Sequence, residues 1–306
     1  MELLATARGL APPPARVLLI ANPASRRAGA LHQRVVSAFR SHGVSCQVIV
    51  TERPGHAAEV VSNLASDFRA VFTLGGDGTA MEVIGALAHS GIPVGVLAGG
   101  TGNLISRSLG IPGRVDKAIG MLLEGEVATI DLGVIDGGRR FAFAAGVGID
   151  AQMVRNASPW LKRRLGVGAY VLAGVRATLQ RRVFRVRVTA DGETMELDAV
   201  AVMLANFGSV LSDLIQLGPG IRQDDGCLDL CVFSPESSLH AARIAWRLLR
   251  KDFRSTKGVV YRAGRTFNVS CTPPQLFQAD GEVLGMTPFT VKVEALAAKL
   301  LVPRQG

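Results

Sequence analysis

The chain of 306 residues is long enough for one large domain or two modest ones, each with a core of its own. Hydrophobic residues make up 48% of it and the mean hydropathy is +0.29, which excludes a disordered chain. No stretch reaches the roughly 18 apolar residues of a membrane-spanning helix, and a net charge of +9 favours anionic partners such as nucleotides, nucleic acid or lipid surfaces.

The N-terminus and the cysteines bear on the compartment. Residues 1–14 end in three prolines and lack the basic start and cleavage site of a signal peptide, so we expect a flexible leader. The four cysteines, at positions 46, 227, 231 and 271, suit no common zinc motif and are expected to be reduced, partly buried thiols. Reduced cysteines favour a cytoplasmic compartment.

Strand and helix patterns alternate through the first 129 residues. Strands are expected at 16–21, 44–50, 71–74 and 93–97, and helices at 30–41, 56–66, 79–88 and 115–123. Such alternation predicts an α/β domain with an open, mostly parallel sheet and helices on both faces.

Glycine-rich or polar breaks at 22–29, 75–79 and 99–103 follow three of these strands, and ligands of parallel sheets bind at such strand ends. The most informative break is Gly75-Gly76-Asp77-Gly78-Thr79, whose bare backbone amides can approach a phosphate closely. Asp77 could hold a divalent metal or accept a proton from a hydroxyl. A plain turn between a strand and a helix is the alternative.

The pattern changes near residue 129 to short runs of period two. Strands are expected at 130–135, 140–145, 184–189, 195–206, 227–233, 258–263 and 266–271, with helical insertions at 158–181 and 237–252. This spacing predicts a mostly antiparallel β-sandwich as a second domain. We expect domains at 15–129 and 130–293, with a last strand at 291–302 that returns to complete the first domain through residues 294–302.

Two acidic turns of the second half are candidate sites. The turn Asp280-Gly281-Glu282 offers two carboxylates, which a phosphoryl-transfer site needs as a base and for organising a metal. The loop from Arg222 to Cys227, with Asp225, could surround a cation with oxygen atoms. Taken alone, each pattern is more typical of a solvated turn between strands.

Basic residues gather in two stretches. Residues 151–190 contain nine Lys or Arg and no acid, and the basic residues at 243, 247, 250, 251 and 254 share one helical face, with Trp246, Leu249 and Phe253 on another. A basic amphipathic helix suits an anionic membrane surface, although a solvated basic face has the same pattern. We recognise no nucleic-acid-binding module, so nucleic acid is not expected as a partner.

In order along the chain, these motifs resemble those of the bacterial diacylglycerol kinase and sphingosine kinase family of lipid kinases. The matching segments are Asn22-Pro23-Ala24-Ser25, Gly75-Gly76-Asp77-Gly78-Thr79, Gly100-Thr101-Gly102-Asn103, Leu109-Gly110-Ile111-Pro112, Asp131-Leu132-Gly133, Ala145-Gly146-Val147-Gly148-Ile149-Asp150, Asp225-Gly226 and Asp280-Gly281-Glu282. The first glycine motif also occurs in NAD kinases, but the ordered set is specific.

The resemblance implies a two-domain kinase whose α/β first domain is similar to that of phosphofructokinase or NAD kinase. It implies that ATP and Mg²⁺ are used to phosphorylate a lipid hydroxyl, with diacylglycerol as the first acceptor to expect. It implies ATP contacts at Asn22, Pro23, Ala24, Ser25, Arg26, Thr51, Gly75, Gly76, Asp77, Gly78, Thr79, Thr101 and Asn103. It implies Glu282 as the base with Asp280 in support and Asp77 as the rival, and a structural Mg²⁺ held by the Asp225 carboxylate and the carbonyls of Arg222 and Cys227.

One position departs from the family's pattern. Many members carry aspartate directly after the asparagine of the second glycine motif, where this chain has Leu104. The departure leaves open the acceptor lipid and makes a catalytically silent nucleotide- or membrane-binding homologue one alternative. The glycine motif shared with NAD kinases makes a soluble kinase of that type the other alternative. We expect peripheral association with the inner face of the membrane, and the sequence is compatible with a homodimer.

Overall fold

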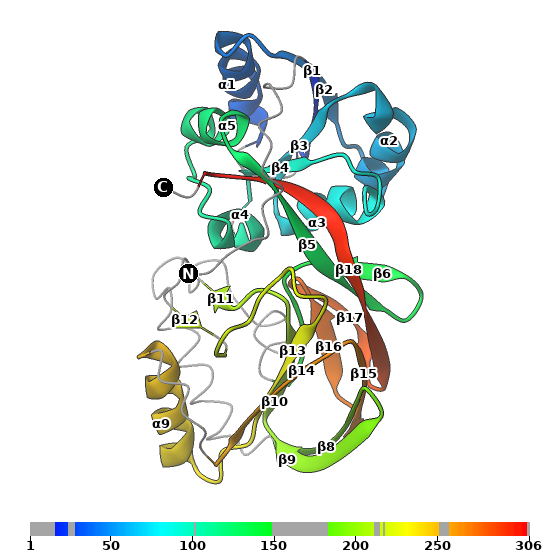
Figure 1. The fold of residues 1–306 in the computed structure, drawn as a ribbon, viewed down its shortest axis with the longest axis vertical. Coiled ribbons are helices and arrows are strands. Elements are labelled where there is room, and N and C mark those ends of the chain that lie inside the picture. Colours follow the sequence, from blue (N-terminus) through cyan, green and yellow to red (C-terminus); the bar gives the residue numbers. More distant parts are fainter. Residues whose placement is uncertain are drawn as a thin grey trace. The chain divides into compact units, whose positions relative to one another are not determined.

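The computed structural model describes residues 16–23, 28–100, 102–148, 183–210, 215–216, 218–250 and 257–304. The leader expected at 1–14 and the helical insertion expected at 158–181 lie outside these residues. The chain divides into two compact units, one formed by residues 1–130 and 296–306 and the other by residues 131–295. Figure 1 colours the chain from blue at the N-terminus to red at the C-terminus.

Unit 1 is built on a parallel sheet. Its strand order is β2 (Ser45–Val50), β1 (Arg16–Ala21), β3 (Ala70–Gly75), β4 (Val94–Ala98) and the end of β18 (Phe289–Val302), where Leu300 lies opposite Val94. All neighbouring pairs run parallel. Strands β3 and β4 are buried along their whole length, as continuous apolar runs of a parallel sheet require.

Helices cover both faces of this sheet. Helices α1 (Ala28–Ser41) and α5 (Val115–Leu123) pack with Val17 and Leu19 of β1, and the rings of Phe39 and Phe72 meet edge to face at 4.8 Å. The other helices of the unit are α2 (His56–Leu64), the 3₁₀ helix η1 (Ala65–Asp67), α3 (Asp77–Ala86) and α4 (Leu104–Ser108). Figure 1 shows α2 and α3 on the side of the sheet away from α1 and α5.

The predicted parallel α/β architecture is confirmed, with two local differences. Helix α3 begins at Asp77, inside the first glycine motif, and not at Thr79. Helix α4 was not predicted, since five residues are too short for a periodic signal.

Unit 2 contains two antiparallel layers. The first has the order β14 (Val259–Gly264), β13 (Leu228–Phe233), β10 (Ala201–Ala205), β7 (Ala144–Gly148), β16 (Leu276–Ala279) and β17 (Glu282–Met286). The second has the order β18, β15 (Thr266–Thr272), β8 (Phe184–Ala190) and β9 (Glu193–Ala199), with β5 (Glu126–Ile135) also against β18 and β6 (Arg139–Phe141) against β5. Phe141, Val186, Leu230 and Phe267 belong to the core between them.

The predicted antiparallel second domain is confirmed, but two predicted strands are each divided. The run expected at 195–206 forms β9 in one layer and β10 in the other, because the half-exposed alternation of β9 gives way to burial after Ala199. The run at 140–145 forms parts of β6 and β7. Helix α9 (Ser238–Leu249) and the two-stranded ribbon of β11 (Ser209–Val210) and β12 (Ile215–Gln216) complete the described part.

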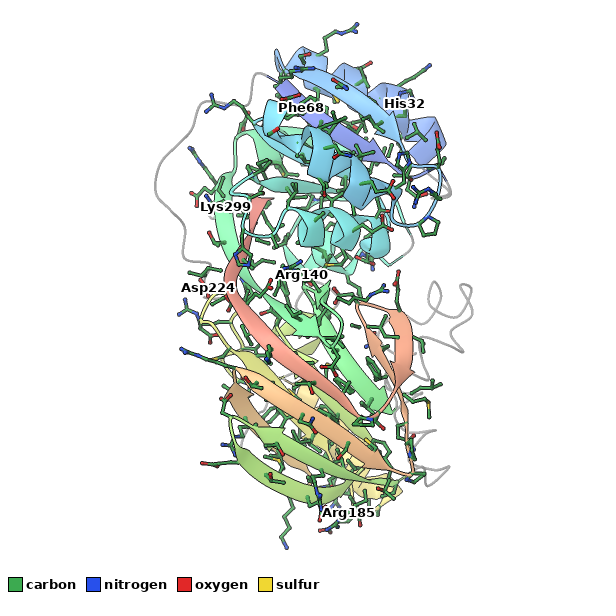
Figure 2. The ribbon with its side chains drawn as sticks, turned by 90° about the vertical axis from the view of Figure 1, so that its right-hand side faces the viewer. His32, Phe68, Arg140, Arg185, Asp224 and Lys299 are labelled. Carbon is green, nitrogen blue, oxygen red and sulfur yellow. The ribbon has the colours of Figure 1, made fainter. Side chains whose placement is uncertain are left out.

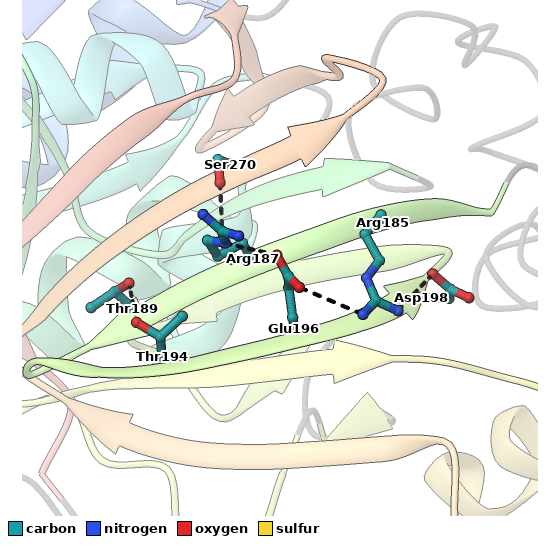
Figure 3. A network of polar contacts seen from close by, with 7 residues as sticks. All are labelled: Arg185, Arg187, Thr189, Thr194, Glu196, Asp198 and Ser270. Atoms are coloured by element: carbon teal, nitrogen blue, oxygen red, sulfur yellow. Dashed lines mark hydrogen bonds and ion pairs between the residues drawn. The ribbon is translucent and has the colours of Figure 1, made fainter.

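Polar side chains cover the outward face of β8. Arg187 Nε donates to Glu196 Oε1 at 2.7 Å, and Arg185 pairs with Asp198 at 3.4 Å (Figure 3). The inward residues of β8 are buried, so the strand has the alternation of a sheet with one solvated face. Within the described residues, no helix is both long and apolar enough to cross a bilayer.

Candidate functional site

The two glycine loops of unit 1 touch backbone to backbone at the ends of β3 and β4. The amide of Gly99 donates to the carbonyl of Gly75 at 2.9 Å. A Cβ on Gly100 would lie 2.6 Å from the Cα of Gly76, and one on Gly99 would lie 2.9 Å from the nitrogen of Gly75. Only glycine permits this approach, so residues 75–79 and the described residues of the second motif, 99–100 and 102–103, form one amide-rich edge of the sheet.

Asp77 is the first residue of α3, and its carboxylate reaches the start of α4. Its Oδ1 accepts the amide of Ile105 at 3.2 Å, and a Cβ on Gly102 would lie 2.8 Å from its Oδ2. Burial raises the pKa of Asp77, and the amides of Ile105, Leu104 and Asn103 oppose this effect. Main-chain donors therefore fix the carboxylate of Asp77 between the two loops. One of these donors is the amide of Leu104, which is present whichever side chain residue 104 carries.

Side-chain amides tie the neighbouring strand ends to these loops. Asn22, directly after β1, donates from Nδ2 to the hydroxyl of Thr79 at 2.9 Å, and its own amide donates to Leu74. Asn103, at a φ of 50°, closes the second loop by accepting the amide of Gly100 and donating to its carbonyl, both at 2.9 Å. Thr51 follows β2 and donates its amide to Ala21 at 2.9 Å.

Most of the residues predicted to contact ATP therefore gather at one edge of the sheet. The described ones are Asn22, Pro23, Thr51, Gly75, Gly76, Asp77, Gly78, Thr79 and Asn103. Ala24, Ser25, Arg26 and Thr101 lie outside the described residues. Backbone amides, hydroxyls and a carboxylate around bare glycine loops form an arrangement that can bind a phosphate chain and its metal ion.

In unit 2, Asp280 is held by the main chain. It lies in the turn between β16 and β17 at a φ of 46°, and its carboxylate accepts the amides of Ala142, Phe143 and Ala144 at 2.8, 2.9 and 3.0 Å. Its own amide donates to the carbonyl of Ala144 at 3.0 Å. Asp280 thus fastens the turn that presents Glu282.

Glu282 has a different environment. Its side chain is 51% exposed and forms an ion pair with Arg139 of β6. The neighbouring Arg140, labelled in Figure 2, pairs instead with Glu294 at 2.7 Å. Glu282 is therefore the more accessible of the two carboxylates in the acidic turn.

The loop at 222–227 contacts a buried aspartate, Asp131, that the sequence identified only as part of a motif. Asp131 is fully buried in β5, and its Oδ2 accepts the amide of Gly226 at 2.7 Å. Asn206 donates to the main-chain carbonyl of Asp131 at 2.8 Å. An aspartate inside an apolar strand is the signal that could have identified this buried polar centre.

Two family models together cover nearly the whole chain. The diacylglycerol kinase catalytic domain matches residues 16–135, and the YegS C-terminal NAD kinase beta sandwich-like domain matches residues 143–302. The chain belongs to the diacylglycerol kinase family.

The relatives of this chain differ in length. An uncharacterised protein of Synechocystis sp. (strain ATCC 27184 / PCC 6803 / Kazusa) is 32% identical over 237 residues, which are 76% of this chain and 54% of that protein, so the chain spans about half of that relative. The diacylglycerol kinase of Bacillus subtilis (strain 168) is 28% identical over 280 residues, which are 89% of this chain and 91% of that protein.

Solved structures share the fold. A diacylglycerol kinase from Bacillus anthracis str. Sterne has a TM-score of 0.72 at 22% identity, covering 94% of this chain and 97% of that one. A second crystal structure from the same organism, of a proposed diacylglycerol kinase, has a TM-score of 0.80 at 24% identity, covering 95% of this chain and 97% of that one.

The family implies Mg²⁺, and the Asp225 loop has suitable donors. Asp225 Oδ1 accepts the amide of Cys227 at 3.0 Å, and within the described residues Oδ2 accepts no hydrogen bond. The Arg222 side chain pairs with Asp224 (labelled in Figure 2) at 3.1 Å, and the sequence assigns the main-chain carbonyl of Arg222, not its side chain, to the ion. The described residues contain no group of three or more His, Cys, Asp or Glu side chains arranged for a metal. A carboxylate with main-chain carbonyls suits Mg²⁺, which usually retains several waters.

Proposed function

We propose that this protein is an ATP-dependent lipid kinase that transfers the γ-phosphate to a lipid hydroxyl. Diacylglycerol is the leading acceptor, with phosphatidic acid as the product, and a sphingoid base or another glycerolipid is the alternative. The observation that supports the proposal best is the fixed carboxylate of Asp77 between two touching glycine loops, in a chain of the diacylglycerol kinase family.

The ATP side of the proposed reaction uses the amide-rich edge of unit 1. Amides of the loops at 75–79 and 99–103 would donate to phosphate oxygens, where negative charge develops during transfer. Asp77 would orient the phosphates and their Mg²⁺, and its main-chain partners at the start of α4 keep it in place for this role. Bound Mg²⁺ would supply charge neutralisation of the phosphates.

We assign the base to Glu282, with Asp77 as the rival. A base has to receive the hydroxyl proton, so it needs access to the acceptor. Glu282 is half exposed and paired only through Arg139 in the described residues, whereas three amides occupy Asp280 and main-chain donors hold Asp77. Asp280 then acts as a positioning residue for the turn.

A competition assay tests the proposed function. Purified protein receives radiolabelled ATP and Mg²⁺ with dioleoylglycerol micelles and NAD in one reaction, and the products are separated. We expect label in phosphatidic acid. Label in NADP alone overturns the lipid assignment in favour of the NAD kinase alternative, and absence of label from both, and from a panel of sphingoid bases and glycerolipids, overturns the kinase assignment in favour of a silent homologue.

A further inference from the structure

Helix α9 is anchored at its start and stands at the edge of unit 2 (Figure 1). The Ser237 hydroxyl accepts the amide of His240 at 3.1 Å, which satisfies one of the free amides of the first turn. The His240 ring accepts the amide of Glu236 through Nδ1 at 3.3 Å, and its Nε2 lies 2.9 Å from the carbonyl of Lys257. These contacts fix the rotation of α9 about its own axis. They therefore determine which of its faces points outward.

The outward face of α9 combines apolar and basic side chains. Its members are Leu239, Ala242, Arg243 and Trp246, with Arg250 directly after the last residue of the helix, at spacings that place all five on one side. Leu239 is 63% exposed and Trp246 is 59% exposed, and the Arg250 guanidinium lies 5.4 Å from the Trp246 ring centre. Two large apolar side chains exposed on the same helical face make it a candidate interaction surface.

The structure corrects the amphipathic pattern expected from the sequence. Trp246 was expected on a different face from the arginines, but it shares the outward face with Arg243 and Arg250. Arg247 is half-buried near Tyr261, and Ile244 is buried. Arg247 therefore lies on the inner side of the helix, and Trp246 lies on the outer side.

The arginines of this outward face differ from those of β8. Residues 237–250 contain no acid, and no described carboxylate pairs with Arg243 or Arg250. On β8, by contrast, Arg185 and Arg187 are paired with Glu196 and Asp198 (Figure 3). The positive charge of the α9 face is thus available to an external anion, while that of β8 is neutralised locally.

We propose that the outward face of α9 docks on an anionic lipid bilayer. Leu239 and Trp246 would enter the boundary between headgroups and acyl chains, where the amphipathic indole ring is favoured. Arg243 and Arg250 would contact lipid phosphates, each adding electrostatic attraction near the charged surface. The net charge of +9 favours the same surface. This docking requires neither nucleotide nor acceptor, so it is independent of the proposed reaction.

A single-tryptophan protein tests the insertion directly. The chain has two tryptophans, and Trp160→Phe leaves Trp246 as the only one. With phosphatidylglycerol vesicles we expect a blue shift of its emission and reduced quenching by acrylamide, and with phosphatidylcholine vesicles no change. An unchanged spectrum with phosphatidylglycerol, or an equal shift with both lipids, overturns the proposal.

Vesicle sedimentation of matched variants separates this face from general charge. Arg243→Gln with Arg250→Gln should weaken binding to phosphatidylglycerol vesicles by about tenfold or more. Arg185→Gln with Arg187→Gln removes the same charge from β8 and should change binding less than about threefold. Equal weakening in both pairs, or none in the α9 pair, overturns the proposal, as does tighter binding to a duplex DNA or to an unrelated protein than to vesicles.

The same variants keep this inference distinct from the proposed function. The α9 pair should phosphorylate a dispersed short-chain diacylglycerol at the rate of the unchanged protein, and lose activity only towards acceptor in vesicles. Thermal unfolding of both pairs checks that each is folded. A protein without any kinase activity would refute the proposed function and leave the fluorescence and sedimentation tests of α9 valid.

Discussion

Asp77 is held by main-chain amides in a partly buried setting, so its negative charge is costly and its position is fixed. In Asp77→Asn, the side-chain oxygen can still accept the Ile105 amide, and the charge is removed. We expect a folded protein whose turnover is lower by about 100-fold, because the phosphates and Mg²⁺ lose an organising charge. Turnover with ATP and thermal unfolding measure both effects.

The control for this variant is Asp67→Asn, which removes an exposed carboxylate of η1 in the same unit. It should leave turnover and stability unchanged. Turnover of Asp77→Asn equal to that of Asp67→Asn would contradict the role assigned to Asp77.

A second experiment with single variants distinguishes the Glu282 carboxylate from its ion pair with Arg139. Glu282→Gln should lower turnover by about 10²- to 10⁴-fold with little change in KM for ATP, because a proton acceptor is lost. Arg139→Gln removes the ion pair and leaves the carboxylate, so most of the turnover should remain.

The outcome also decides between the two candidate bases. An active Glu282→Gln beside an inactive Asp77→Asn would transfer the role of base to Asp77. If Arg139→Gln were as inactive as Glu282→Gln, the ion pair itself would be the required feature.

At the scale of elements, the contact between the glycine loops depends on the missing side chains. A methyl group on Gly100 would lie 2.6 Å from the Cα of Gly76, a distance that the backbone has to relieve by moving. We expect Gly100→Ala to cost about 1–3 kcal/mol of stability and to weaken ATP binding, since it separates the two loops. Denaturant unfolding and calorimetric titration with ATP measure the two effects.

Gly113→Ala is a matched control in the same unit, because a Cβ there would meet nothing within 4 Å. It should be neutral or slightly stabilising. An ATP affinity in Gly100→Ala equal to that in Gly113→Ala would show that the loop contact does not shape the nucleotide site.

The turn between β16 and β17 rests on three hydrogen bonds to one carboxylate. Asp280→Ala leaves the amides of residues 142–144 without their acceptor, so we expect a loss of about 2–4 kcal/mol in the free energy of unfolding. Asp280→Asn keeps an acceptor oxygen and tolerates the φ of 46°, and should lose less. A folded but inactive Asp280→Asn would assign Asp280 to the chemistry and not to positioning.

The elements that could be predicted are those with a local signal. The apolar runs of β1, β3 and β4 and the periodicity of α5 carry their structure within a few residues. Helix α4 could not be predicted, because five residues form a helix only with partners such as Asp77, which is 28 residues from Ile105.

Long-range partners limited the prediction of the candidate site in the same way. The motifs identified Asp280 and Asp131, but the amides that hold Asp280 are 136 to 138 residues away, and the amide that Asp131 accepts is 95 residues away. On α9, the helical spacing was correct, while the packing near Tyr261 decided which arginine turned inward. Composition and spacing contain no information on either choice.

At the scale of the whole molecule, the net charge of +9 combines charges that are paired with charges that are open. Arginines paired to carboxylates, as on β8, contribute little to the field far from the surface, whereas the α9 arginines add to it. A protein that approaches an anionic bilayer through such a face should be sensitive to salt, because the Debye length falls from about 30 Å at 0.01 M to about 10 Å at 0.1 M.

We therefore expect salt to lower activity towards diacylglycerol in phosphatidylglycerol vesicles, by about tenfold between 0.01 and 0.3 M, since each surface arginine loses most of its attraction to the bilayer. Activity towards a dispersed short-chain acceptor should change much less over this range, because that acceptor requires no docking. Arg243→Gln with Arg250→Gln should flatten the salt dependence on vesicles, and Arg185→Gln with Arg187→Gln should leave it steep. Equal salt sensitivity with both acceptors would place the effect of salt on ATP binding, and the open charge of α9 would then have no part in reaching the substrate.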